Sequence, residues 1–177
     1  AAQHPNKDAL IFPYRDSWQS TSYLELHTWA VAFATGLQQR GVKTGDRVLV
    51  LVKPSVDLYI TLFGLLHLGA VPVLADPGMG RKRLLHAIQS SAPVAVVGLP
   101  VVHTIAFFAR KTFATVRVSV TTGSRLFGGN YTLSSIIEVG EATDKITPYR
   151  ARHDDEAAIV FTSGSTGAPK GVSFRHG

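Results

Sequence analysis

Apolar residues in the first third of this chain follow a helical pattern and then an extended one. They first recur at alternating steps of four and three, at Leu26, Ala30, Phe33 and Leu37. The segment Ser22 to Glu25 before them has the spacing of a helix capping box, and Gly41 is a natural end point. The unbroken run 48–52 follows a polar turn, as in a strand that is covered on both faces. The sequence therefore predicts an amphipathic helix followed by a central parallel strand.

The alternation of helical and extended segments continues along most of the chain. Helices are predicted over 55–68, 81–91, 101–111 and 133–139. Strands are predicted over 71–74, 94–98, 116–120 and 157–161. Between 121 and 152 the pattern weakens, which suggests an excursion between sheet elements. Together these elements predict an α/β fold with a doubly wound, mostly parallel sheet flanked by helices.

The apolar stretch 58–75 is nearly as long as a membrane span, which needs about 20 residues. Gly64, His67, Gly69 and Pro72 interrupt it. Gly69 is better explained as the residue just after a buried helix, ahead of a buried strand. No transmembrane segment is expected.

Composition narrows the class of protein without identifying it. Hydrophobic residues make up 45% of the chain and charged residues 17%, which suits a folded protein with a sizeable core. There is no cysteine, and the first residues lack the pattern of a signal peptide, so a cytoplasmic location is expected. The net charge of +6 is scattered apart from the run Arg81 to Arg83, and no nucleic-acid partner is expected.

The segment that carries chemistry follows the apolar strand 157–161. Hydroxyl-bearing residues, glycines and a lysine crowd into ten positions. The candidate phosphate-binding residues are Thr162, Ser163, Gly164, Ser165, Thr166, Gly167, Lys170 and Gly171. Glycines let successive backbone N–H groups converge on an anion, hydroxyls add donors and the lysine adds a positive charge. This combination favours a polyphosphate ligand over an ordinary surface turn, which needs only two or three such residues.

The loop departs from the two best-known nucleotide motifs. A Walker loop has a glycine immediately before its lysine and a serine or threonine after it, whereas Lys170 lies between Pro169 and Gly171. Proline also removes a backbone donor. No G-x-G-x-x-G fingerprint for a dinucleotide is present.

Phe161 to Gly171 resembles the signature loop of the AMP-forming superfamily that includes acyl-CoA synthetases, luciferases and the adenylation domains of peptide synthetases. Three other segments resemble this superfamily in the same order: 21–26, 45–48 and 68–77. Shorter pieces are most similar to bacterial olefin β-lactone synthetases and to fatty-acyl ligases, namely 53–55, 76–80, 126–129 and 174–177.

This resemblance implies that a carboxylic acid, fatty or β-hydroxy fatty, reacts with ATP to give an acyl-AMP and pyrophosphate. Lys170 and the loop hydroxyls would stabilise the departing pyrophosphate. The acyl group would then pass to CoA, or the substrate's own β-hydroxyl would close a β-lactone. The superfamily also uses Mg²⁺, whose ligand is expected outside this segment, and no metal site is expected within it.

The resemblance also implies that residues 1–177 form the amino-terminal portion of the large adenylation domain. Segments that bind adenine, ribose and Mg²⁺, and a small carboxy-terminal domain with a catalytic lysine, normally follow. No catalytic residue is therefore assigned here, and the chain alone is expected to be inactive. A homo-oligomer or a complex with a pathway enzyme is left open.

Two other classes of protein remain as alternatives. A non-catalytic α/β module could hold an anion through the same loop, and a nucleic-acid binder would show salt-dependent affinity. His176 aligns with a histidine that follows the family loop, with a role in chemistry or in packing left open. His27, His67 and His103 lie in predicted helices without the spacing of metal ligands, so packing is expected of them.

Overall fold

The computed structural model describes residues 3–14, 17–123, 129–162 and 169–177, and a seven-stranded sheet forms its centre. In chain order its strands are β3 (Arg47–Leu51), β4 (Val71–Ala75), β5 (Ala95–Gly98), β6 (Val118–Thr121), β7 (Tyr131–Thr132), β8 (Glu156–Thr162) and β9 (Lys170–Arg175). Across the sheet the order is β7-β6-β5-β3-β4-β8-β9. All neighbours are parallel except β8 and β9, which are antiparallel. The predicted mostly parallel sheet is confirmed.

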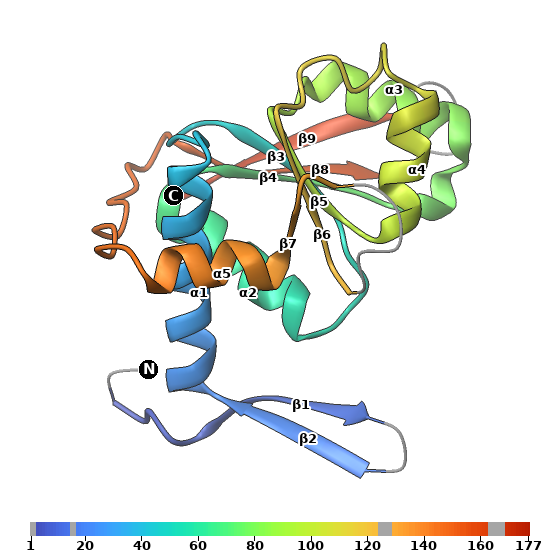
Figure 1. The fold of residues 1–177 in the computed structure, drawn as a ribbon. Helices are drawn as coiled ribbons and strands as arrows, with labels where there is room; N and C mark the ends of the chain where they lie inside the picture. Colours follow the sequence, from blue (N-terminus) through green and yellow to red (C-terminus); the bar gives the residue numbers. More distant parts are fainter. Residues whose placement is uncertain (1–2, 15–16, 124–128, 163–168) are drawn as a thin grey trace.

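Helices cover both faces of this sheet (Figure 1). They are α1 (Tyr23–Gln39), α2 (Val56–Leu68), α3 (Arg81–Ser91), α4 (Pro100–Phe108) and α5 (Leu133–Glu141). Val48 and Val50 point into one core with α1, α2 and α5, while Leu49 and Leu51 point into a second core with α3 and α4. Side chains alternate along a strand, so an apolar run such as β3 fills both cores. The fold is the doubly wound arrangement that the pattern predicted.

Two local predictions about helix ends are also confirmed. The side chain of Ser22 accepts a hydrogen bond from the Glu25 backbone N–H at 3.2 Å, and the Ser22 N–H donates to the Glu25 carboxylate at 2.8 Å. That N–H also lowers the pKa of Glu25. Gly69 ends α2 in the left-handed conformation with φ 74°, which separates the apolar stretch into α2 and β4. In the described ranges, no helix combines the length and the apolar character needed to cross a membrane.

The structure adds strands that the pattern did not predict. An antiparallel hairpin of β1 (Asp8–Tyr14) and β2 (Ser17–Ser22) precedes α1 and extends away from the main sheet (Figure 1). The turn after β4 contains a short 3₁₀ helix (Pro77–Met79), in which the Asp76 carboxylate accepts the Gly78 N–H at 2.7 Å. Strand β9, which follows the candidate phosphate loop, was not predicted either.

Glycines allow α1 and α5 to pack with their backbones in close approach. A Cβ on Gly140 of α5 would overlap the carbonyl group of Ala32, and one on Gly36 of α1 would overlap that of Ile136. Both glycines are buried. Larger residues would force the two helices apart, because packed interiors relax only partly.

We expect Gly140→Ala to destabilise the fold by about 1–3 kcal/mol, because the overlap outweighs the gain in helix propensity. Glu138→Ala, at an exposed position of the same helix, is the control and should change the free energy of unfolding by less than about 0.5 kcal/mol. Urea unfolding of both variants measures the difference. Equal stabilities would contradict the close approach of α1 and α5.

Candidate nucleotide-binding site

The candidate phosphate loop connects β8 to β9, and the pairing of these strands fixes its two ends. Thr162, the last residue of β8, is the antiparallel partner of Lys170, the first residue of β9. Strand β8 runs parallel to β4, with Leu74 opposite Val160 and Ala75 opposite Phe161. The loop therefore starts at the carboxyl edge of the parallel strands, which is where α/β sheets bind ligands.

The predicted site residues divide into those that the structure places and those outside its described part. It places the backbone of Thr162 together with Lys170 and Gly171 at the neck of the hairpin, with Lys170 and Gly171 exposed and Pro169 buried. Ser163, Gly164, Ser165, Thr166 and Gly167 lie outside the described residues. The exposed ammonium of Lys170 can thus meet an anion that approaches the carboxyl edge.

Gly171 lies at the neck with an aromatic ring in the space beside it. A Cβ there would lie 2.9 Å from the Phe161 ring and 3.2 Å from a methyl group of Ile159. Phe161 and Ile159 are both 6% exposed and belong to the core beneath α3. The absence of a side chain at Gly171 leaves room for the ring of Phe161, its partner on the neighbouring strand, so this glycine contributes to the packing of the hairpin.

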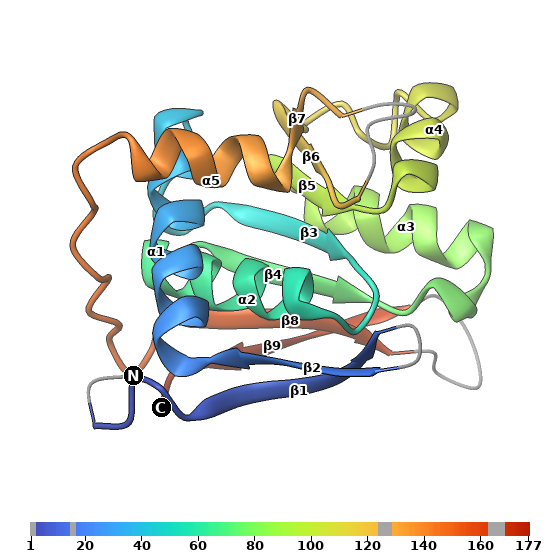
Figure 2. The ribbon, with the colours of Figure 1, turned by 60° about the horizontal axis from the view of Figure 1, so that its bottom comes forward.

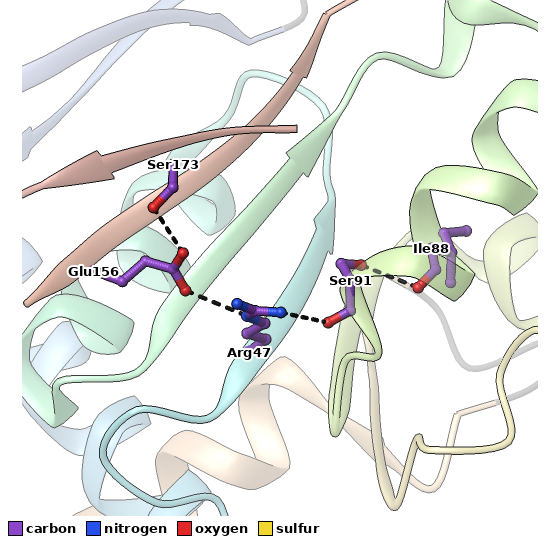
Figure 3. Close-up of polar contacts among 5 residues, drawn as sticks. All are labelled: Arg47, Ile88, Ser91, Glu156 and Ser173. Atoms are coloured by element: carbon purple, nitrogen blue, oxygen red, sulfur yellow. Dashed lines mark hydrogen bonds and ion pairs between the residues drawn. The ribbon is translucent and has the colours of Figure 1, made fainter. Parts of the chain in front are cut away.

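Charged and polar side chains fasten the opposite end of the hairpin (Figure 3). The Glu156 carboxylate meets the Arg47 guanidinium at 3.2 Å and accepts a hydrogen bond from the Ser173 hydroxyl at 2.7 Å. Arg47 also donates to the backbone carbonyl of Ser91 at 3.5 Å. This network joins β3, β8, β9 and the end of α3. No local sequence pattern indicates it, because Arg47 and Glu156 are 109 positions apart.

A cavity of about 370 Å³ lies between α3 and this hairpin. Its lining combines polar groups near the network with apolar groups near the neck of the loop: Arg47, His86, Ser90, Glu156, Phe161 and Gly171. In the described part of the chain, no group of three or more His, Asp or Glu side chains could hold a metal ion.

A second anchor holds the residue just before β8. The Asp155 carboxylate accepts hydrogen bonds from the Tyr149 hydroxyl and the Arg152 N–H, both at 2.6 Å. These donors lower the pKa of Asp155, the Tyr149 hydroxyl having the larger effect, while the same bond raises the pKa of Tyr149. The backbone N–H of His176 donates to the Asp155 carbonyl at 3.2 Å, so His176 helps to close the hairpin.

The three histidines of the predicted helices, His27, His67 and His103, contact neighbouring elements. His103 is buried in α4 and lies 3.2 Å from the Val120 carbonyl, and burial lowers its pKa. The rings of His27 and His67 meet edge to face between α1 and α2, 6.4 Å apart. They help to line an apolar groove of about 340 Å³, whose lining residues all come from α1 and α2 and none from the β8–β9 hairpin.

A parallel α/β sheet that carries a hydroxyl- and glycine-rich loop at its carboxyl edge defines a nucleotide-binding class of protein. The chain matches the AMP-binding enzyme family over residues 1–177 and belongs to that family. This membership explains why four segments of the chain, including the candidate phosphate loop, resemble the family in the same order.

Curated and structural relatives agree with this membership. An olefin β-lactone synthetase of Stenotrophomonas maltophilia is 41% identical over 156 residues, which are 87% of this chain and 28% of that protein. A fatty acyl-adenylate ligase from L. pneumophila, solved with acyl adenylate and pyrophosphate, is 27% identical with a TM-score of 0.71 and covers 97% of this chain and 28% of its own. An anthranilate CoA ligase shares the fold with a TM-score of 0.86 at 20% identity, covering 98% of this chain and 32% of its own. This chain thus spans about a third or less of each relative.

We expect Asp155→Asn to destabilise the protein at neutral pH, because it removes the charge that both donors stabilise. The folded-state pKa is depressed, so the stabilisation is present above the unfolded pKa of about 3.9 and is lost as pH falls through the folded pKa. The stability difference between wild type and variant should therefore shrink below about pH 4.

Denaturant titrations at several pH values measure this difference. Asp144→Asn, at an exposed position nearby in sequence, is the control and should show no such trend. A difference that stays constant down to pH 2 would show that the charge of Asp155 is irrelevant.

Proposed function

We propose that the complete protein activates a fatty or β-hydroxy fatty acid with ATP, giving an acyl-AMP and pyrophosphate. The observation that carries this proposal is the strand-paired neck of the phosphate loop, which presents Lys170 at the carboxyl edge of the sheet. Membership of the AMP-binding family and the named activities of two relatives support it. The proposal includes a cytoplasmic location, where ATP is supplied.

In the proposed reaction, a carboxylate oxygen of the substrate forms a bond to the α-phosphorus of ATP. The bond between that phosphorus and the bridging oxygen breaks, and its electron pair leaves with pyrophosphate. Negative charge then grows on the departing group, where donors and a cation stabilise it most. We assign this role to Lys170 together with the hydroxyls and N–H groups of residues 162–167.

We further propose that the β-hydroxyl of the substrate completes the reaction. Its oxygen attacks the acyl carbonyl carbon, AMP departs with the bonding electrons, the hydroxyl proton is lost and a four-membered lactone forms. The 41% identical β-lactone synthetase supports this second step. In the proposed arrangement residues 1–177 are the amino-terminal portion of the adenylation domain, and other parts of the protein supply the acyl pocket and the Mg²⁺ ligand.

We expect Lys170→Ala in the complete protein to slow adenylation by about ten- to a hundredfold, the effect of one lost charge-assisted contact of roughly 1.5–3 kcal/mol. ATP–pyrophosphate exchange with a fatty acid measures this rate. Lys43→Ala is a matched control, because Lys43 is exposed just before β3, at the amino edge of the sheet. Equal exchange rates for Lys170→Ala and wild type would contradict the role of Lys170.

The second step is tested by supplying a β-hydroxy fatty acid and ATP without CoA. We expect a β-lactone and AMP to accumulate, detected by mass spectrometry. A product that forms only with CoA, as a thioester, would contradict lactone formation but leave adenylation intact. Nucleotide binding without any exchange would instead favour the non-catalytic binding module.

A further inference from the structure

The middle of the chain has an uneven distribution of charge. Between Pro77 and Ile137 there is no aspartate or glutamate. The same stretch contains the basic residues Arg81, Lys82, Arg83, Arg110, Lys111, Arg117 and Arg125. It includes both α3 and α4, the two helices on one face of the sheet. This acid-free stretch therefore carries much of the excess of basic residues that gives the chain its net charge of +6.

Helix α4 presents large apolar side chains on the outside of this basic layer. Its inner face is anchored in the protein by Val102 and His103, which are buried. Three other side chains of this helix are largely exposed: Val101 is 58% exposed, Phe107 61% and Phe108 76%. Arg110 and Lys111 follow directly and are also exposed. Two adjacent phenylalanines and two adjacent cations thus share one end of α4, which lies at the periphery of the fold (Figure 2).

The geometry of this end favours lipid over nucleic acid. The rings of Phe107 and Phe108 meet edge to face, with centroids 5.4 Å apart at 89°. The Arg110 guanidinium lies over the Phe107 ring, 4.8 Å from its centroid. Stacking of successive bases needs free, accessible ring faces, and here one face of Phe107 is already occupied. Apolar rings beside cations are instead typical of segments that enter the interface of an anionic membrane.

We propose that the outer face of α4 is a peripheral docking site for an anionic lipid bilayer. Phe107 and Phe108 enter the boundary between headgroups and acyl chains, while Arg110 and Lys111 contact anionic headgroups. The positive field of the acid-free stretch orients the protein as it approaches the membrane. A single short segment of this kind gives weak, reversible binding. This inference does not depend on the proposed adenylation.

The test is sedimentation of the complete protein with vesicles of phosphatidylcholine alone or of phosphatidylcholine mixed with anionic phosphatidylglycerol. We expect binding to the anionic vesicles and loss of binding at high salt. The double variant Arg110→Gln and Lys111→Gln should weaken binding roughly 25-fold, at about fivefold per cation. The double variant Phe107→Ser and Phe108→Ser should weaken it by about tenfold or more.

Two control variants show whether the loss of any exposed aromatic residue, or of any lysine, would weaken vesicle binding equally. Trp18→Ser removes an aromatic side chain that is 74% exposed on the β1–β2 hairpin, and Lys43→Gln removes a lysine before β3. Both should bind vesicles like wild type, and thermal melting should show that every variant is folded.

Three results would each overturn the proposal: no binding to anionic vesicles, equal binding by the α4 variants and wild type, or salt-sensitive binding to single-stranded RNA but not to vesicles. If the protein does not bind anionic vesicles, labelling by hydroxyl radicals shows whether Phe108 is covered by another part of the complete protein. Loss of adenylation in these variants without lipid would mean that α4 belongs to the catalytic machinery.

Discussion

The parallel pairing of β8 with β4 is the contact on which the candidate site depends. It aligns the end of β8 with the carboxyl edge of the sheet and gives β9 a strand to pair with. The antiparallel pairing then places Lys170 beside Thr162, although eight positions separate them in the chain. A phosphate loop in an unpaired connection would have to order both ends on binding, at a cost in conformational entropy. In this fold the pairing of Thr162 with Lys170 already orders both ends of the loop.

The anchoring contacts and the candidate phosphate loop lie at opposite ends of the β8–β9 hairpin. The Arg47–Glu156–Ser173 contacts and the Asp155–Tyr149 hydrogen bond all lie where β8 begins. Lys170 and the loop lie where β8 ends. Partly exposed ion pairs stabilise a fold only modestly, so the contribution of this network is mainly to fix geometry.

Sequence patterns predicted the helices and strands whose buried residues recur at regular positions. Strand β3 is apolar at every position from Val48 to Leu51, and Ser22 with Glu25 marked the start of α1. The β1–β2 hairpin was not predicted, because most positions of β2 are polar and exposed and β2 therefore has no apolar face to detect. Strand β9 did carry a signal: Val172 and Phe174 alternate with polar residues. The hydroxyl- and glycine-rich residues just before it indicated a ligand-binding loop and no strand.

The anchors of the site could not be predicted, since they join residues distant in sequence through an irregular segment. Residues 142–155 contain no helix or strand, yet they connect the end of α5 to the start of β8. Lys145 donates to the Gly140 and Glu141 carbonyls at the end of α5, and the Tyr149 N–H donates to the His67 carbonyl of α2. The Tyr149 ring then fills the space beside Gly69, where a Cβ would collide with it. The glycine that ends α2 thus also makes room for the tyrosine that holds Asp155, and so helps to position the strand that carries the loop.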